Sequence, residues 1–108
     1  MRSLTAVQLD GLIESATVDC DNDSEQVCRL FTNLDEALTV PFARTVLGAA
    51  VTVTAIDLTV DDRIVAVCTR GMSRQRIPLL DLPMPDPPPP GAEWIEAYRR
   101  WSTQQRGA

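Results

Sequence analysis

The hydrophobic periodicity of the chain changes at Pro41, and this change restricts the fold more than any other feature of the sequence. Before Pro41, apolar residues recur at the spacing of one helical face: Val27, Leu30, Phe31, Leu34 and Leu38. After it, Val51, Val53 and Ala55 alternate with threonines, as in a strand with one buried face. Because proline lacks an N–H and clashes with the preceding turn, the helix cannot continue through it. We therefore predict an α+β domain with its helices first and an antiparallel sheet after them.

The helical part is expected to cover residues 1–40 and to contain two helices. A Thr-x-x-Gln capping box opens the first, which is expected over residues 5–15. The second is expected over residues 23–38, with Asp21 or Asp23 as its N-cap. Together they form an N-terminal helix pair.

The β part is expected over residues 41–82 as a small, curled antiparallel meander. The predicted strands are residues 49–57, 63–70 and 74–79, with 42–46 as a candidate fourth. The strand over 63–70 is apolar on both faces, which indicates a central position, whereas Pro78 confines the next strand to an edge. Turns are predicted at Gly71 and at the pair Asp61 and Asp62.

Proline dominates the segment that follows the predicted sheet. Six of the eight prolines lie in residues 83–91, so this segment is expected to be a stiff, extended arm. A C-terminal helix is expected over residues 92–103, because both tryptophans and the only tyrosine fall on one helical stripe. We expect this aromatic helix to dock on the rest of the domain and residues 104–108 to fray. The prediction is one domain over residues 1–108.

Charge is divided unevenly along the chain, whose formal net charge is −5. Residues 1–62 carry eleven acids and three Arg, whereas residues 63–108 carry seven Arg and four acids. An acidic half argues against nucleic acid as a partner and favours a hard cation. Arg70, Arg74 and Arg76 form a cationic patch at the predicted hairpin. We expect them to pair with acids of the chain itself; the alternative is that they bind an acidic partner or a phosphate.

The composition excludes several kinds of chemistry. The absence of His rules out a Ser-His-Asp triad, a Cys-His pair and a His-containing zinc site. Cys20, Cys28 and Cys68 have no C-x-x-C spacing and are expected to be free thiols. No apolar run approaches the roughly 20 residues of a membrane span, and the N-terminus lacks the apolar stretch of a secretory signal. We expect a cytoplasmic protein that is not an enzyme and has no membrane partner.

A carboxylate cluster is the strongest candidate for a functional site. The metal candidates are Asp19, Asp21, Asp23, Glu25, Asp35 and Glu36. Ca²⁺ takes six to eight oxygen ligands, which a short acidic loop supplies. The EF-hand pattern fails, because Ser24 and Leu30 stand where that loop needs Gly and Glu. The alternative interpretation is that the first acids only cap the second helix and favour its dipole.

Part of the chain resembles a known family. Residues 18–19, Glu25, 34–36, Leu38 and 40–42 are similar to the pattern V-D-A-Y-x-x-E-E…L-[ED]-[ED]-x-L-x-[FV]-P-F. That pattern belongs to the small bacterial calcium-binding protein family best known from cyanobacteria, and a branch of short uncharacterised bacterial proteins is similar over most of the chain. The resemblance implies an SH3-like barrel decorated by helices. It also implies Ca²⁺ binding through Asp19, Glu25, Asp35 and Glu36.

Two functional hypotheses follow. The first is weak to moderate Ca²⁺ binding through the carboxylate cluster by a non-enzymatic protein. The second is a protein-interaction or homodimerisation module without metal, which uses the proline arm and the aromatic helix. A Ca²⁺ titration discriminates between them.

Overall fold

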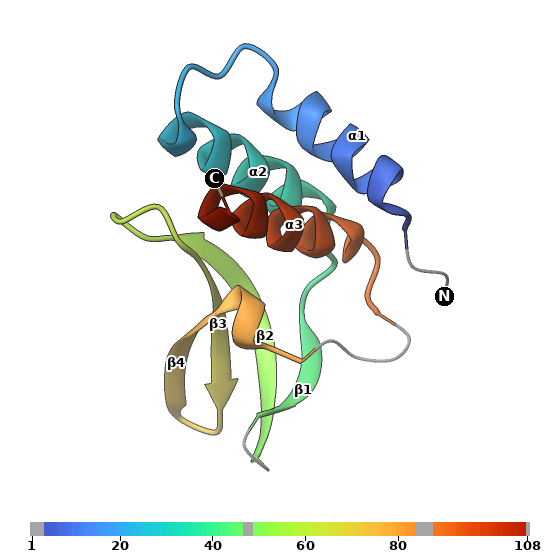
Figure 1. Cartoon of the computed structure of the whole chain (residues 1–108). Helices are drawn as coiled ribbons and strands as arrows, with labels where there is room; N and C mark the ends of the chain where they lie inside the picture. The colour runs from blue at the N-terminus through green and yellow to red at the C-terminus, as the bar shows by residue number, and fades with distance from the viewer. Residues whose placement is uncertain (1–3, 47–48, 84–87, 108) are drawn as a thin grey trace.

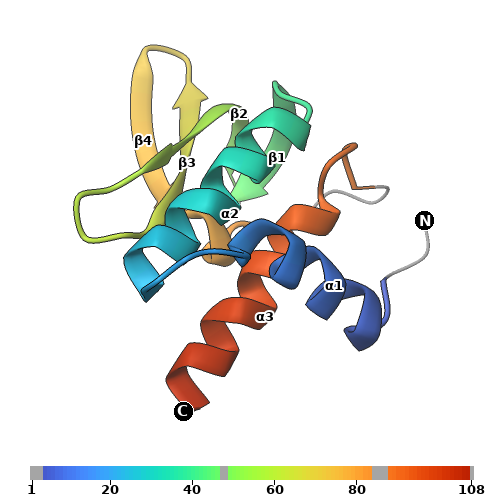
Figure 2. The same cartoon turned by 90° about the horizontal axis from the view of Figure 1, so that it is seen from above.

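The computed structural model describes residues 4–46, 49–83 and 88–107, and Figure 1 shows their arrangement. The helices are α1 (Ala6–Thr17), α2 (Asp23–Ala37), α3 (Glu93–Gly107) and the short 3₁₀ helix η1 (Leu79–Asp81). The strands are β1 (Phe42–Val46), β2 (Ala49–Leu58), β3 (Ile64–Arg70) and β4 (Ser73–Pro78). Figures 1 and 2 show the three α-helices gathered to one side of the sheet. The predicted α+β class is confirmed.

The sheet is an antiparallel meander in the order β1-β2-β3-β4. The central position of β3 and the edge position of the strand with Pro78 are confirmed, and the candidate fourth strand is β1. A bulge between Val53 and Ala55 shifts the register of β2 against β3. Within the described residues β1 and β4 do not pair, so the sheet is open. The SH3-like barrel stays a prediction.

The starts of the first two helices follow from side chains that cap them. Thr5 accepts from the backbone N–H of Gln8, and the Gln8 side chain accepts from that of Thr5, which confirms the capping box. α1 then continues to Thr17, beyond its predicted end. The N-cap of α2 is Asn22, so the prediction of Asp21 or Asp23 was wrong. The reason is that the side-chain oxygen Oδ1 of Asn22 accepts the hydrogen bond from the backbone N–H of Glu25, at 2.9 Å.

The core lies between the helices and the inner face of the sheet. Val27, Leu30 and Leu34 of α2 are at most 1% exposed, which confirms the predicted apolar face. Alternate residues of β2 and β3 face them, with Val53 and Cys68 buried. The aromatic side chains of α3 pack against this same cluster, so the helix docks on the rest of the fold as expected. None of the described helices is long and apolar enough to cross a membrane.

An ion pair joins α1 to α3. Arg100 Nε lies 2.6 Å from Asp10 Oδ1, its Nη2 lies 3.1 Å from Oδ2, and the Gln104 side chain donates to the same carboxylate at 3.2 Å. α3 extends through Gly107, beyond its predicted end at residue 103, and Ala108 lies outside the described residues. The bond from Gln104 to α1 gives that last segment a tertiary partner, which the local sequence does not reveal.

This ion pair predicts a pH dependence of stability. The hydrogen bond from Arg100 lowers the pKa of Asp10 from its ordinary 3.8. A carboxyl whose pKa is depressed by folding contributes stability that is complete above its unfolded-state pKa and is lost as the pH falls through the folded value. We expect Asp10→Asn to lower Tm at pH 7 and to have little effect near pH 2. Circular dichroism melts across this range check it, with Glu14→Gln as the α1 control; a Tm difference that persists at pH 2 contradicts it.

Candidate functional site

Four of the predicted metal residues lie together at the junction of α1 and α2. Asp19, Asp21, Asp23 and Glu25 are all exposed, and Asp19 adopts the left-handed backbone conformation with φ 68°. The Glu25 carboxylate accepts a hydrogen bond from the backbone N–H of Asp21 at 2.9 Å. The Asn22 side chain satisfies the free backbone N–H of Glu25, and the Glu25 carboxylate in turn bonds to the residue before the cap. These contacts are the ones expected of helix capping.

The other two predicted ligands lie at the opposite end of α2. Asp35 lies ten positions after Glu25, which corresponds to about 15 Å along a helix. The structure therefore does not bring Asp35 and Glu36 into one coordination shell with the loop acids. Within the described residues, no group of three or more Cys, Asp or Glu side chains could hold a metal ion. Ca²⁺ binding remains a prediction that these contacts do not test.

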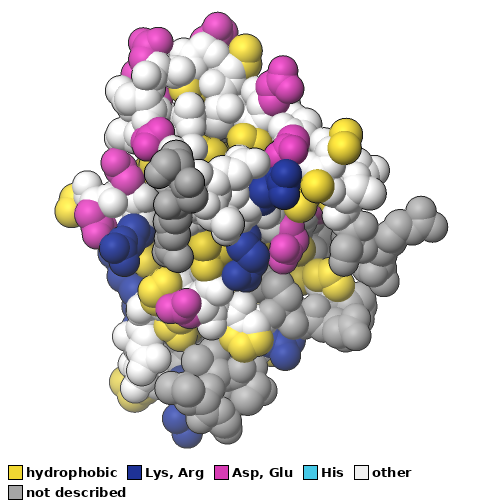
Figure 3. Space-filling model, viewed as in Figure 1, with side chains coloured by type: hydrophobic (Ala, Val, Ile, Leu, Met, Phe, Trp, Pro, Cys, Tyr) yellow, Lys and Arg dark blue, Asp and Glu magenta, His cyan; other side chains and the backbone are white. Residues whose placement is uncertain are grey.

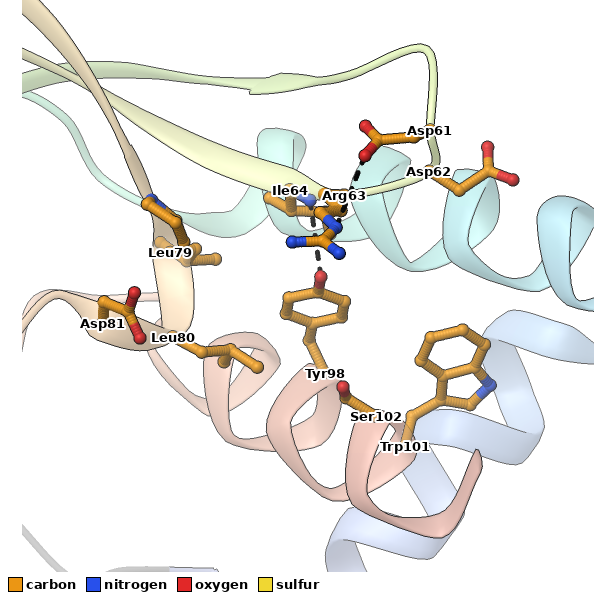
Figure 4. A pocket seen from close by; sticks show the side chains of 11 residues that line it. Asp61, Asp62, Arg63, Ile64, Leu79, Leu80, Asp81, Tyr98, Trp101 and Ser102 are labelled. Atoms are coloured by element: carbon orange, nitrogen blue, oxygen red, sulfur yellow. Dashed lines mark hydrogen bonds and ion pairs between the residues drawn. The ribbon is translucent and has the colours of Figure 1, made fainter. Parts of the chain in front are cut away.

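A pocket of about 330 Å³ lies where the β2–β3 turn, the end of β4 and α3 meet (Figure 4). Its rim is polar and its inner wall is apolar and aromatic. The lining residues are Asp61, Asp62, Arg63, Ile64, Pro78, Leu79, Leu80, Asp81, Tyr98, Trp101 and Ser102. The aromatic helix thus forms one wall of the site that the fold creates.

The upper rim of the pocket is a tightly hydrogen-bonded turn. The backbone N–H of Thr59 donates to Arg63 O at 2.8 Å, and that of Asp62 donates to Thr59 O at 3.1 Å. The Thr59 hydroxyl accepts from Arg63 N at 3.0 Å and donates to the carboxylate of Asp61. Asp62 has φ 65°, a left-handed conformation that Asp tolerates. The turn therefore holds both aspartates at the mouth of the pocket without a ligand.

The aromatic wall is held from two sides. Tyr98 and Trp101 stack with ring centroids 6.3 Å apart and planes inclined by 18°. The Tyr98 hydroxyl accepts from the backbone N–H of Ile64 at 3.3 Å, which ties α3 to β3. Trp101 Nε1 donates to the side chain of Gln26 at 2.8 Å, which ties α3 to α2. These bonds leave the rings in one orientation.

The electrostatics of the pocket are dominated by carboxylates. Asp61, Asp62 and Asp81 line it with a single guanidinium, that of Arg63, whose Nε lies 3.4 Å from Asp61 Oδ2. The hydrogen bond from the Thr59 hydroxyl, helped by the charge of Arg63, lowers the pKa of Asp61. The site is therefore negative at neutral pH.

The sequence did not indicate this pocket. It predicted only a turn at Asp61 and Asp62, which the structure confirms, and it assigned no role to Asp81. The one usable signal was an aromatic stripe on α3 in a chain with two acids at a predicted turn. No local motif links these residues, because they come from three separate segments.

The cationic hairpin is partly neutralised from within the chain. Arg76 of β4 forms an ion pair with Asp57 of β2, an acid of the first half. Arg70 and Arg74 are exposed and form no ion pair within the described part of the chain. The expected internal pairing thus holds for one of the three arginines. In Figure 3 many acidic side chains lie over the helical part of the molecule.

Among the thiols, Cys68 of β3 is 1% exposed. Burial raises the pKa of its thiol, as expected for a core side chain rather than a nucleophile. Cys20 is half-buried and Cys28 is exposed, and all three cysteines are free.

Comparisons with protein-family models, with curated proteins and with solved structures find no match to this chain. The resemblance to the bacterial calcium-binding family therefore stays a prediction, and the function must be argued from the site itself.

Proposed function

We propose that this protein is a non-enzymatic binding module and that the pocket against α3 is its binding site. The observation that carries the proposal is the preformed wall of Tyr98 and Trp101 in a pocket lined by three carboxylates, of which that of Asp61 is held by Thr59. A concave site with apolar walls and a few convergent polar groups is the usual form of a ligand site. Its volume is at the lower end of the roughly 300–1,000 Å³ range of ligand pockets, which favours a single side chain or a small molecule.

A pocket-filling substitution tests this proposal. Ser102 lines the pocket, whereas its neighbour Thr103 is exposed on the same helix. Small cationic, neutral and anionic probe peptides are titrated against the protein and followed by NMR. We expect at least one of them to cause saturable shifts of the Trp101 indole resonance and of the backbone amides around it. Ser102→Leu should abolish those shifts, and Thr103→Leu should preserve them. Absence of any saturable shift at the pocket contradicts the proposal.

Ca²⁺ binding at the α1–α2 loop is a second candidate function. The observation that favours it is that Asp19, Asp21, Asp23 and Glu25 form no ion pair with Arg among the described residues. Their mutual repulsion would be relieved by a cation, which would stabilise the fold by mass action. This candidate goes together with the SH3-like barrel, because the resemblance to the calcium-binding family implies both that fold and Ca²⁺ binding.

A melting experiment tests the Ca²⁺ candidate. At a free Ca²⁺ concentration ten times Kd, binding adds about 1.4 kcal/mol to the free energy of unfolding, which corresponds to a Tm rise of roughly 5–10 °C. We expect Asp19→Asn and Glu25→Gln to remove this rise. Asp35→Asn at the far end of α2 should leave it unchanged. No change of Tm in millimolar Ca²⁺, together with no heat in titration calorimetry, rules the candidate out.

A further inference from the structure

We infer that the pocket against α3 recognises a guanidinium group, presented by an arginine side chain of a partner protein. This inference rests on the proposed function of the pocket, and it specifies the chemistry of the ligand. It is carried by the combination of carboxylates from two lining segments with an aromatic wall in one pocket.

The charge of the lining selects a cation. Asp61 already has a partner in Arg63, at 3.4 Å. Asp62 and Asp81 are exposed and form no ion pair within residues 4–46, 49–83 and 88–107. They stand on different elements, the β2–β3 turn and η1, and in Figure 4 the Asp62 carboxylate points away from Tyr98 while Asp81 lies on the other side of the ring. Together with Asp61 they make the surroundings of the pocket negative, which attracts a cation.

The aromatic wall favours a guanidinium over a compact ammonium. Tyr98 and Trp101 line the pocket as a stacked pair, with Tyr98 buried and Trp101 half-buried. A planar guanidinium stacks on aromatic faces, is more weakly hydrated than an ammonium and binds a carboxylate with two hydrogen bonds. The apolar side chains of Leu79 and Leu80 offer a surface to the aliphatic stem of an arginine.

An anionic ligand fits the same lining poorly. Arg63 is the only cationic side chain among the lining residues, and Asp61 already neutralises it. Arg99 donates to Leu80 O at 3.4 Å beside the pocket and is paired with Glu96 at 3.9 Å. An anion would therefore meet two unpaired carboxylates and no free guanidinium of the lining.

Titration with three blocked tripeptides, followed by NMR, tests the inference. The peptides are Gly-Arg-Gly, the same peptide with neutral citrulline, which preserves the shape of arginine, and Gly-Glu-Gly. We expect the arginine peptide to shift the Trp101 indole with a Kd at least fivefold lower than that of the citrulline peptide. Butylguanidine, which has the guanidinium chain without a peptide, should bind more weakly than Gly-Arg-Gly. If butylguanidine and Gly-Arg-Gly bind with equal affinity, the ligand is a small molecule with a guanidinium group, and the inference of a protein partner is overturned.

Variants of the lining residues test whether the charge of the pocket affects binding in the expected direction. Asp81→Asn and Asp62→Asn should each weaken binding of the arginine peptide about twofold to fivefold, the range of an exposed ion pair. Arg63→Ala should strengthen it by a similar factor, because it removes the resident cation and frees Asp61. Asp35→Asn, at the far end of α2, should have no effect. Weaker binding by Arg63→Ala overturns the inference.

Failure of this inference and failure of the proposed function have different signatures. If the citrulline or glutamate peptide binds as tightly as the arginine peptide, the pocket is a binding site but does not select a guanidinium. If none of the probes shifts pocket resonances, the proposed function itself is contradicted.

Discussion

Gly91→Ala is expected to lower the free energy of unfolding by about 2–5 kcal/mol, from roughly 1–2 kcal/mol of left-handed backbone strain and 1–3 kcal/mol of overpacking. Gly91 is buried, has φ +92° and brings the start of α3 against the end of α2. A Cβ there would lie 2.1 Å from Ala37 O and 2.5 Å from Leu38 N. These are backbone atoms of a helix end, so no side chain can rotate away to make room.

The same contact is held by a hydrogen bond. The backbone N–H of Thr39 donates to Pro90 O at 2.9 Å, next to Gly91. The substitution therefore pushes apart two segments that a backbone bond holds together. Urea denaturation, followed by circular dichroism, measures the loss.

Two other glycines serve as matched controls for this prediction. Gly11 lies in exposed α1, and a Cβ there meets nothing within 4 Å, so Gly11→Ala should stabilise the protein by up to about 1 kcal/mol through helix propensity. Gly71 has φ +59° in open space, so Gly71→Ala should cost only the conformational strain of about 1–2 kcal/mol. If Gly91→Ala is no worse than Gly71→Ala, the close approach of α2 and α3 is not as described.

Leu34→Ala is expected to destabilise the protein by about 2–5 kcal/mol, the range for a fully buried leucine. Leu34 is 0% exposed and lies on the face of α2 that belongs to the common core of the helices and the sheet. Its removal leaves a cavity in the core that the helices share with the sheet. Chemical denaturation measures this loss. If the slope of the free energy of unfolding against denaturant concentration is unchanged, the loss is one of stability and not a change in the surface exposed on unfolding.

The control for Leu34→Ala is an exposed apolar residue on another helix. Val7 of α1 is 81% exposed, and alanine has the higher helix propensity, so Val7→Ala should leave stability nearly unchanged or slightly raised. If the Leu34→Ala and Val7→Ala variants have the same free energy of unfolding, the assignment of Leu34 to the core is contradicted.

Much of the fold was predictable because it depends on neighbours in the chain. The apolar face of α2 and the alternation of β2 each report which side of an element is buried. The central position of β3 followed from its two apolar faces, and Pro78 indicated the edge strand. Predictions failed where two side chains competed for one role: Asn22 displaced the aspartates as N-cap, a choice that depends on local geometry rather than on residue type.

The candidate site was much less predictable. Acids close together in the sequence suggested a metal site, but the ends of α2 keep Glu25 and Asp35 about 15 Å apart. The acids that line the pocket come from two separate segments: Asp61 and Asp62 from the β2–β3 turn, and Asp81 from η1, further along the chain. Their convergence depends on how α3 docks, which is governed by side-chain packing over the whole core.

The sequence by itself determined the class of the fold, the order of its elements and the face that each one buries, because these properties depend on spacings of two to four residues. Only the tertiary structure decided which charges meet. It placed Asp10 beside Arg100, left Gly91 no room for a side chain, and brought the carboxylate rim over Tyr98 and Trp101. These contacts join residues distant in the chain, and such contacts depend on the relative placement of whole helices and strands, which local periodicity does not specify.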